Sequence, residues 1–273
     1  MGPRRNRLSM HDDRRARQIA PRRLAPRACP ANGSVTSTPR EGSEENAPWL
    51  APGCPADLTQ GMRVTKHEHA ALVLVESGHT LVIDPGSFTS PLEDLVGLVG
   101  IVITHEHPDH WTPEHLTRLL KAHPGTPVYG PEGVQRAAAG FDVTVVNPGD
   151  TLTLEPFRLE FFGGRHAVIH ESLPDIDNVG VLVNDTFYYP GDSYAVPKGA
   201  HVDLLAAPVG APWLKIGDAM DFVLAVKPRR VFATHDMTLS VAGKQMGAAR
   251  LTWAVEQHGG TFVELPPGDT TDA

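Results

Sequence analysis

The sequence predicts a mixed α/β fold of the α+β kind, in which two β-sheets are covered by outer helices. From Met62 onward, short segments rich in Val and Leu alternate with turn-forming residues, a pattern typical of strands. In each half of this region, several strands come first and mixed strand–helix units follow. This order favours two sheets with helices on their outer faces over a single doubly wound sheet.

The first half of the regular region is expected to consist mostly of strands. Residues 99–104 form an apolar run of β-branched residues, which is typical of a strand buried on both faces. A helix should begin after Thr112, because Thr can cap it, Pro113 suits the first helical position and Glu114 places an acid in the first turn. We expect this helix to reach about His123. Further strands are predicted at residues 63–67, 70–75, 80–83, 127–129, 143–146, 151–154 and 157–162.

The second half shows the same kinds of pattern with longer helical segments. Apolar residues recur at helical spacing near residues 216–226 and 241–258. The predicted strands of this half are residues 178–183, 186–189, 202–207, 230–233 and 261–265.

The first 61 residues differ from the rest in composition. They lack hydrophobic periodicity and are crowded with Pro, Arg, Ser and Gly, so we expect a disordered extension ahead of a folded domain at residues 62–273. A basic tail for an acidic partner is one interpretation. A non-functional extension, with translation starting nearer Met62, is favoured because the arginines are scattered and no aromatic residues interleave with them.

Charge and cysteine content narrow the function classes. Residues 1–61 carry ten Arg and six acids, a net charge of +4, which leaves −12 on residues 62–273. Such an acidic domain repels polyanions, so nucleic acid is not the expected partner. Cys29 and Cys54 both precede the domain, which excludes a thiolate metal site or a disulfide framework within it. The chain has neither a membrane-spanning apolar run nor the apolar core of a secretory signal, so we expect a cytoplasmic enzyme.

The strongest motif is the run His-Glu-His-Pro-Asp-His at residues 105–110, between a predicted strand and a predicted helix. A tight loop can aim His105 and His107 at one point and turn Asp109 and His110 toward a second. Imidazole and carboxylate groups suit Zn²⁺, Fe and Mn-type ions. A chance cluster of surface histidines is disfavoured by the strand–loop–helix context.

With this motif, the sequence resembles the metallo-β-lactamase superfamily over most of residues 62–273. That family places an HxHxDH motif at a strand end, with an Asp before it and a His, an Asp and a His after it. Asp84, His166, Asp192 and His235 match these positions in order, and each stands just after a predicted strand. The resemblance implies a four-layer αββα sandwich.

The resemblance also implies a dinuclear metal centre that holds two divalent ions, with zinc favoured and manganese or iron as alternatives. His105, His107 and His166 would hold one ion. Asp109, His110 and His235 would hold the other, and Asp192 would bridge them. A hydroxide bound by the two metals would then be the nucleophile.

Several residues are expected to support this centre. Asp109 is the candidate catalytic residue, because its carboxylate could orient the hydroxide or accept its proton. Asp84 should hydrogen-bond a ligand His or the loop. His170 competes with His166 as a ligand, but His166 is nearer the strand end, which leaves His170 as a pocket or supporting residue. His69 is similar to the His of a Gly-His-Ala stretch in lactonase-like members, although Glu68 replaces the Gly; a place near the metals and a place at the core edge both stay open.

Weaker pocket candidates are Trp111, Arg165, Trp213 and Lys215, for which ordinary packing or surface roles are favoured.

The residue at the bridging position, Asp192, narrows the range of reactions that we expect. Members of the family that cleave β-lactams usually carry Cys or Ser where this chain has Asp192, so antibiotic hydrolysis is disfavoured. The sequence is most similar to the L-ascorbate-6-phosphate lactonase-like branch. We therefore expect hydrolysis of an ester, lactone or phosphodiester bond in a small-molecule substrate. The alternatives are a nuclease of the tRNA-processing type and a mononuclear iron oxygenase that uses only His105, His107 and His166.

Overall fold

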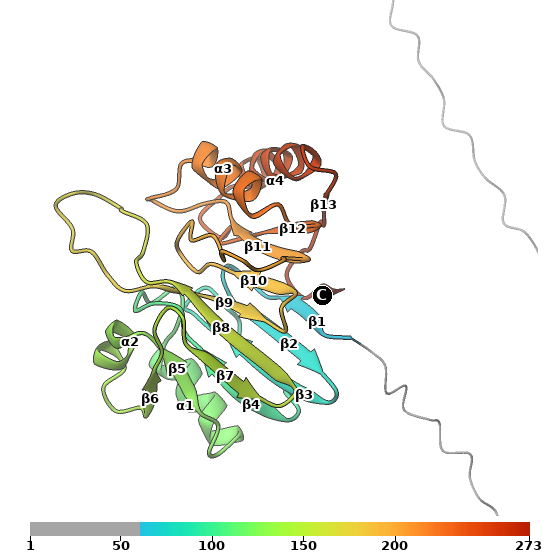
Figure 1. Cartoon of the computed structure of the whole chain (residues 1–273). Helices are drawn as coiled ribbons and strands as arrows, with labels where there is room; N and C mark the ends of the chain where they lie inside the picture. The colour runs from blue at the N-terminus through green and yellow to red at the C-terminus, as the bar shows by residue number, and fades with distance from the viewer. Residues whose placement is uncertain (1–60) are drawn as a thin grey trace, which may run out of the picture. The chain divides into compact units, whose positions relative to one another are not determined.

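A computed structural model of the chain describes residues 61–273. The predictions for residues 1–60, including the disordered extension and both cysteines, lie outside these residues. Figure 1 shows two sheets lying against each other, with α1 and α2 beside one sheet and α3 and α4 beside the other. Among the helices described, none has the length and apolar character that crossing a bilayer requires.

Within residues 61–273 each sheet has seven strands, and half of its strand pairings are antiparallel and half parallel. The first sheet has the order β14-β1-β2-β3-β4-β5-β6 and the second β13-β12-β11-β10-β9-β8-β7. The strands of the first sheet are β1 (Arg63–Lys66), β2 (Leu72–Glu76), β3 (His79–Ile83), β4 (Leu98–Val102), β5 (Val128–Gly130), β6 (Val143–Val145) and β14 (Thr270–Asp272). Those of the second are β7 (Thr151–Leu154), β8 (Phe157–Gly163), β9 (Val179–Val183), β10 (Phe187–Tyr189), β11 (Leu204–Pro208), β12 (Arg230–Thr234) and β13 (Thr261–Phe262).

Each helix lies in a connection between two neighbouring parallel strands, as is usual for parallel pairing. They are α1 (Pro113–Ala122), α2 (Glu132–Ala137), α3 (Ile216–Val226) and α4 (Val241–Glu256). The predicted start of α1 is confirmed, because the Thr112 hydroxyl accepts a hydrogen bond from the His115 N–H at 3.1 Å and Pro113 is the first helical residue.

Three hydrophobic cores separate the four layers. Because side chains alternate along a strand, Leu72 and Leu74 of β2 face the second sheet while Val73 faces α1 and α2. In the same way, Leu205 of β11 packs toward α3 and α4, and Leu204 lies in the core between the sheets. The arrangement confirms the predicted αββα sandwich.

Two elements were not predicted. Helix α2 has only six residues, contains Gly133 and begins at Pro131 without a side-chain cap. Strand β14 consists of three largely exposed residues that pair with β1, some two hundred positions earlier in the chain. Neither element carries the periodic pattern from which the others were inferred.

Candidate metal centre

The candidate residues gather where strands of both sheets end. Asp84 follows β3, and the motif at residues 105–110 lies between β4 and α1. His166 follows β8, and Asp192 and His235 follow β10 and β12. The ends of the parallel strands meet at one edge of each sheet, so five segments far apart in sequence reach one place.

The buried carboxylate of Asp84 organises this edge. Its oxygens accept hydrogen bonds from the Thr104 N–H at 2.8 Å, the Thr104 hydroxyl at 2.6 Å and the Tyr189 hydroxyl at 3.0 Å. His110 Nδ1 lies 2.7 Å from Asp84 Oδ2. Asp84 therefore touches both a candidate ligand and the loop, the contacts that we expected of it.

The first group of candidate ligands comprises His105, His107, His166 and Asp192, with one ligand atom of each within 4.8 Å of the others. His105 Nε2 lies 3.0 Å from His107 Nδ1, and His166 Nε2 lies 3.5 Å from Asp192 Oδ2. All four are buried except His107, which is half-buried. This is the set that the sequence assigns to one ion together with the bridging Asp.

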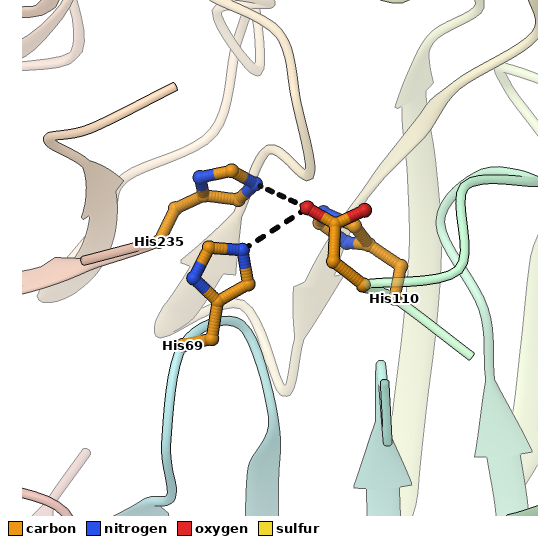
Figure 2. A group of neighbouring side chains, drawn as sticks. His69, His110 and His235 are labelled. Atoms are coloured by element: carbon orange, nitrogen blue, oxygen red, sulfur yellow. Dashed lines mark hydrogen bonds and ion pairs between the residues drawn. The ribbon is translucent and has the colours of Figure 1, made fainter. Parts of the chain in front are cut away.

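The second group comprises His69, Asp109, His110 and His235, again within 4.8 Å. His69 Nε2 and His235 Nε2 lie 3.1 and 3.4 Å from the same oxygen, Asp109 Oδ2 (Figure 2). Three of these residues form the predicted second set. His69 joins them from the turn between β1 and β2, so of its two predicted places it takes the one beside the candidate ligands.

Asp192 lies between the two groups. Its Oδ1 is 3.2 Å from His110 Nε2, and its Oδ2 is 3.1 Å from His235 Nε2 and 3.5 Å from His166 Nε2. The Asp192 N–H donates to Asn178 Oδ1 at 3.0 Å, which fixes the turn after β10. One carboxylate thus faces nitrogen atoms of both groups.

The hydrogen bonds around the groups fit a bound cation. His166 Nδ1 and His235 Nδ1 lie 2.5 and 2.6 Å from the carbonyl oxygens of Ala167 and Gly210, so each Nδ1 carries the proton and donates it. Their Nε2 lone pairs then point toward the centre. Within the described part of the chain, four buried atoms there have no hydrogen-bond partner: His110 Nε2, His166 Nε2, His235 Nε2 and Asp192 Oδ1. Buried atoms of this kind are the ones that a metal satisfies.

The electrostatics keep the carboxylates ionised. Burial disfavours the charged form of Asp192, but the nearby imidazoles of His110 and His235 outweigh it and hold the pKa of Asp192 well below its ordinary value. Burial likewise opposes ionisation of Asp109, and the adjacent imidazoles of His235 and His69 outweigh it and lower its pKa. Two carboxylates are therefore available to offset the charge of bound cations.

The backbone at this edge is tightly built. Asp84, His69 and His235 adopt φ values of 50°, 60° and 55°, in the left-handed region that non-glycine residues rarely enter. Gly86 lies so close to the Asp109–His110 peptide that a Cβ there would fall 1.8 Å from the Asp109 carbonyl oxygen. The glycine therefore lets the loop after β3 touch the loop after β4.

The remaining candidates fall outside the two groups. His170 is exposed, with its Nδ1 2.8 Å from the Ser172 hydroxyl, so His166 rather than His170 stands in the first group. Trp111 packs in the core beneath α1 and donates to the Glu106 carbonyl oxygen. Lys215 is exposed and pairs with Asp218, and Arg165 pairs with Asp175 and Asp177.

The residues beneath the centre were mostly missed. Trp213 was only a weak pocket candidate, yet its indole N–H donates to Asp192 Oδ2 at 3.0 Å. Thr104 and Tyr189 were placed in strands without a role, and Gly86 was given no role. Nothing in a single sequence marks such residues, because the contacts that matter join separate strands.

Comparison with known proteins shows the family to which the chain belongs. A family model described as the beta-lactamase superfamily domain matches residues 63–235. The chain belongs to this superfamily. A Mycobacterium tuberculosis member of similar sequence, Protein Rv0786c, is 38% identical over 197 residues, which cover 70% of this chain and 92% of that protein.

Solved structures share the superfamily fold at low sequence identity. Igni18, a metallo-hydrolase from Ignicoccus hospitalis, aligns with a TM-score of 0.61 and 17% identity over 78% of this chain and 98% of that one. The diiron β-hydroxylase CmlA from Streptomyces venezuelae gives a TM-score of 0.59 and 17% identity over 78% of this chain and 54% of that one. Superfamily membership and the two ligand groups together identify the chain as an enzyme, a metal-dependent hydrolase.

Proposed function

We propose that this superfamily member is a dinuclear zinc hydrolase that cleaves an ester or lactone bond in a small-molecule substrate in the cytoplasm. The position of Asp192 carries the proposal. Its two oxygens lie 3.2 Å from His110 Nε2 and 3.5 Å from His166 Nε2, so one carboxylate faces both ligand groups. A mononuclear site at the first group would leave the second group, which includes the buried His235 and His110, without a metal ion to bind.

His105, His107 and His166 would hold one ion, Asp109, His110 and His235 the other, and Asp192 would contact both. When bound, two such ions supply Lewis acidity and lower the pKa of a shared water toward neutrality. All protein groups in this set are imidazoles or carboxylates, which suits zinc and also admits manganese or iron.

Asp109 is placed to handle the proton. Its side chain is 25% exposed, whereas that of Asp192 is 2% exposed, so Asp109 alone of the two carboxylates reaches the open side of the centre. A hydrogen bond from His69 holds its Oδ2. An ionised, oriented carboxylate beside the reacting group can orient a water molecule and accept its proton.

The substrate has room beside the first group. A cavity of about 450 Å³ is lined by His107 and His166 and by the loop between β8 and β9. This volume lies in the range of small-molecule sites. A nuclease is disfavoured, because the net charge of −12 on residues 62–273 repels a polyanionic strand.

Metal quantification of the purified protein tests the proposal, with substitutions of His107 and Asp192 as companions. We expect about two zinc ions per chain in the wild type. His107→Ala and Asp192→Asn should abolish ester or lactone hydrolysis while the circular dichroism spectrum stays native. A single iron ion per chain together with O₂ consumption would establish the oxygenase alternative, and full activity of either variant would refute the ligand assignment.

A further inference from the structure

We infer that the cavity beside His107 and His166 takes an uncharged ester or lactone with an aliphatic group, and that it discriminates against phosphorylated substrates. The inference rests on the proposed hydrolase function and adds the substrate class to it. It follows from the side chains of one loop and from the charges around them.

The loop between β8 and β9, residues 164–178, forms most of the cavity. Figure 1 shows it as a long excursion that extends beyond the ends of the two strands. All the residues that line the cavity belong to this loop except Glu106 and His107. The substrate-binding surface is therefore largely a single segment placed next to the candidate ligands.

Aliphatic side chains dominate the wall that this loop provides. Val168 is 73% exposed, Leu173 51% and Ile169 37%, and all three line the cavity. Ile176 continues the same wall nearer the strand. Exposed aliphatic groups gathered in one concave site favour an apolar ligand, because its binding removes them from water.

The charges of the cavity are negative. Glu106, Glu171 and Asp175 line it, and within residues 61–273 no Lys or Arg does. The guanidinium of Arg165, which precedes the lining residue His166 in the chain, lies 3.7 Å from Asp175 and 3.3 Å from Asp177.

Glu106 and Glu171 form no ion pair within the described residues. A phosphate group bound in this cavity away from the metal centre would meet two carboxylates without a matching Lys or Arg side chain. Such unpaired like charges select against an anionic ligand, whereas an uncharged ester incurs no such cost.

The position of the cavity orients the substrate. His107 and His166 belong to the first ligand group and also line the cavity, so a ligand that fills it touches the centre. The carbonyl group would lie beside these histidines, and the aliphatic part would extend along Val168 and Leu173. Chain length should then affect binding through the loop rather than through the centre.

The first test compares substrates on the zinc-loaded full chain. Nitrophenyl esters from acetate to octanoate should show kcat/KM rising roughly two- to fourfold per added methylene group, as burial of each methylene predicts. Nitrophenyl phosphodiesters should be cleaved far more slowly. A preference for the phosphodiesters, or ester rates that do not depend on chain length, would overturn the inference.

Two sets of variants locate the effect. The Val168→Ser, Leu173→Ser double variant should flatten the dependence on chain length with metal content unchanged. The control Val96→Ser, Val241→Ser variant, which alters two exposed aliphatic residues that do not line the cavity, should not. Glu171→Lys should raise the ratio of phosphodiester to ester cleavage about tenfold, since it supplies the missing cation; Glu93→Lys should leave that ratio unchanged.

A binding measurement separates this inference from the proposed function. Calorimetry with 2-octanone, which cannot be hydrolysed, should show weaker binding to the double variant than to the wild type and the Val96, Val241 control. Absence of any hydrolysis together with this binding pattern would refute the hydrolase and keep the apolar site. Equal binding to all three proteins would refute the apolar site, even in an active hydrolase.

Discussion

His69 donates its Nε2–H to Asp109 Oδ2 across 3.1 Å. The direction follows from the other side of the ring, where the Met237 backbone N–H donates to His69 Nδ1 at 3.2 Å. Burial lowers the pKa of His69 and so favours the neutral ring, in which an accepting Nδ1 leaves the proton on Nε2. His69 therefore positions Asp109 and does not itself supply a lone pair to a metal.

Replacement of His69 tests this assignment. His69→Ala should lower kcat/KM by roughly 10- to 100-fold while metal content stays at that of the wild type, because a supporting hydrogen bond is lost and no ligand is. His69→Gln, which can still donate to Asp109, should recover part of the activity. The exposed His79 of β3 provides the control, His79→Ala. Loss of one metal ion per chain in His69→Ala would instead identify His69 as a ligand.

Trp213 should tune the bridging carboxylate. Its indole N–H donates to Asp192 Oδ2, and Trp213→Phe removes only that donor while keeping an aromatic ring. We expect kcat/KM to fall about tenfold and the metal affinity to weaken. Trp253→Phe, in the exposed part of α4, should have no effect on either quantity. Unchanged metal affinity and activity in Trp213→Phe would make the contact incidental.

Lys66 and Asp236 form a buried ion pair. Replacing one partner should lower the free energy of unfolding more than replacing the other. Lys66 Nζ is almost fully buried and lies 3.4 Å from Asp236 Oδ2, which the Lys244 ammonium also approaches at 3.3 Å. Lys66→Met leaves Asp236 paired with Lys244, so the free energy of unfolding should fall by less than about 1.5 kcal/mol. Asp236→Asn leaves a buried ammonium without a carboxylate and should cost about 3 kcal/mol. Urea unfolding of both variants, with exposed Lys121→Met as the control, measures the difference.

The stability of the Asp236→Asn variant should depend on pH in one direction, which the pKa of Lys66 determines. Burial lowers the pKa of Lys66 from its ordinary 10.5, so above the lowered value the unfolded chain binds more protons than the folded one. Stability of the variant should therefore rise with pH across the interval between the lowered pKa and 10.5, and its deficit relative to wild type should shrink. Urea unfolding in neutral and alkaline buffer checks this; a deficit that grows with pH would contradict it.

Gly86 should be intolerant of any side chain. A Cβ would overlap the Asp109–His110 peptide, so Gly86→Ala must displace the loop that carries two candidate ligands. We expect loss of the second metal ion and of most activity. Gly217→Ala in α3 is the control, because the nearest atom to its Cβ would be 3.8 Å away; it should stabilise the helix by about 0.5–1 kcal/mol. Full metal content in Gly86→Ala would show that the loop can yield.

The sequence predicted those parts of the centre that depend on local pattern. Asp84, His166, Asp192 and His235 each follow a strand that hydrophobic periodicity had located, and parallel strands end at a common edge. Asp84 was expected to hydrogen-bond a ligand His or the loop, and it contacts both His110 and Thr104. Local pattern therefore sufficed for most strands of the two sheets, whereas most of the grouped side chains were assigned by the family resemblance.

The parts that depend on contacts between separate segments of the chain were not predictable. His69 reaches Asp109 from a turn whose position is set by pairing of β1 with β2, and Trp213 reaches Asp192 from the segment between β11 and α3. Lys66 ends a strand and would be expected at the surface; it is buried because Asp236, which follows β12 of the second sheet, lies against it. Such contacts join segments that lie between 21 and 170 residues apart, and they leave no trace in either segment alone.

The candidate ligands are divided between the two halves of the chain. The half that ends with β6 carries His105 and His107, and the half that begins with β7 carries His166 and Asp192, so neither holds a complete first group. A protein cut between β6 and β7 would yield two fragments with half a centre each. Tight metal uptake by the mixed fragments, and by neither alone, would thus report their reassembly. Because the ligands come from both sheets, bound metal would cross-link the sheets. Loss of metal should therefore weaken the packing of the two sheets against each other before either sheet unfolds.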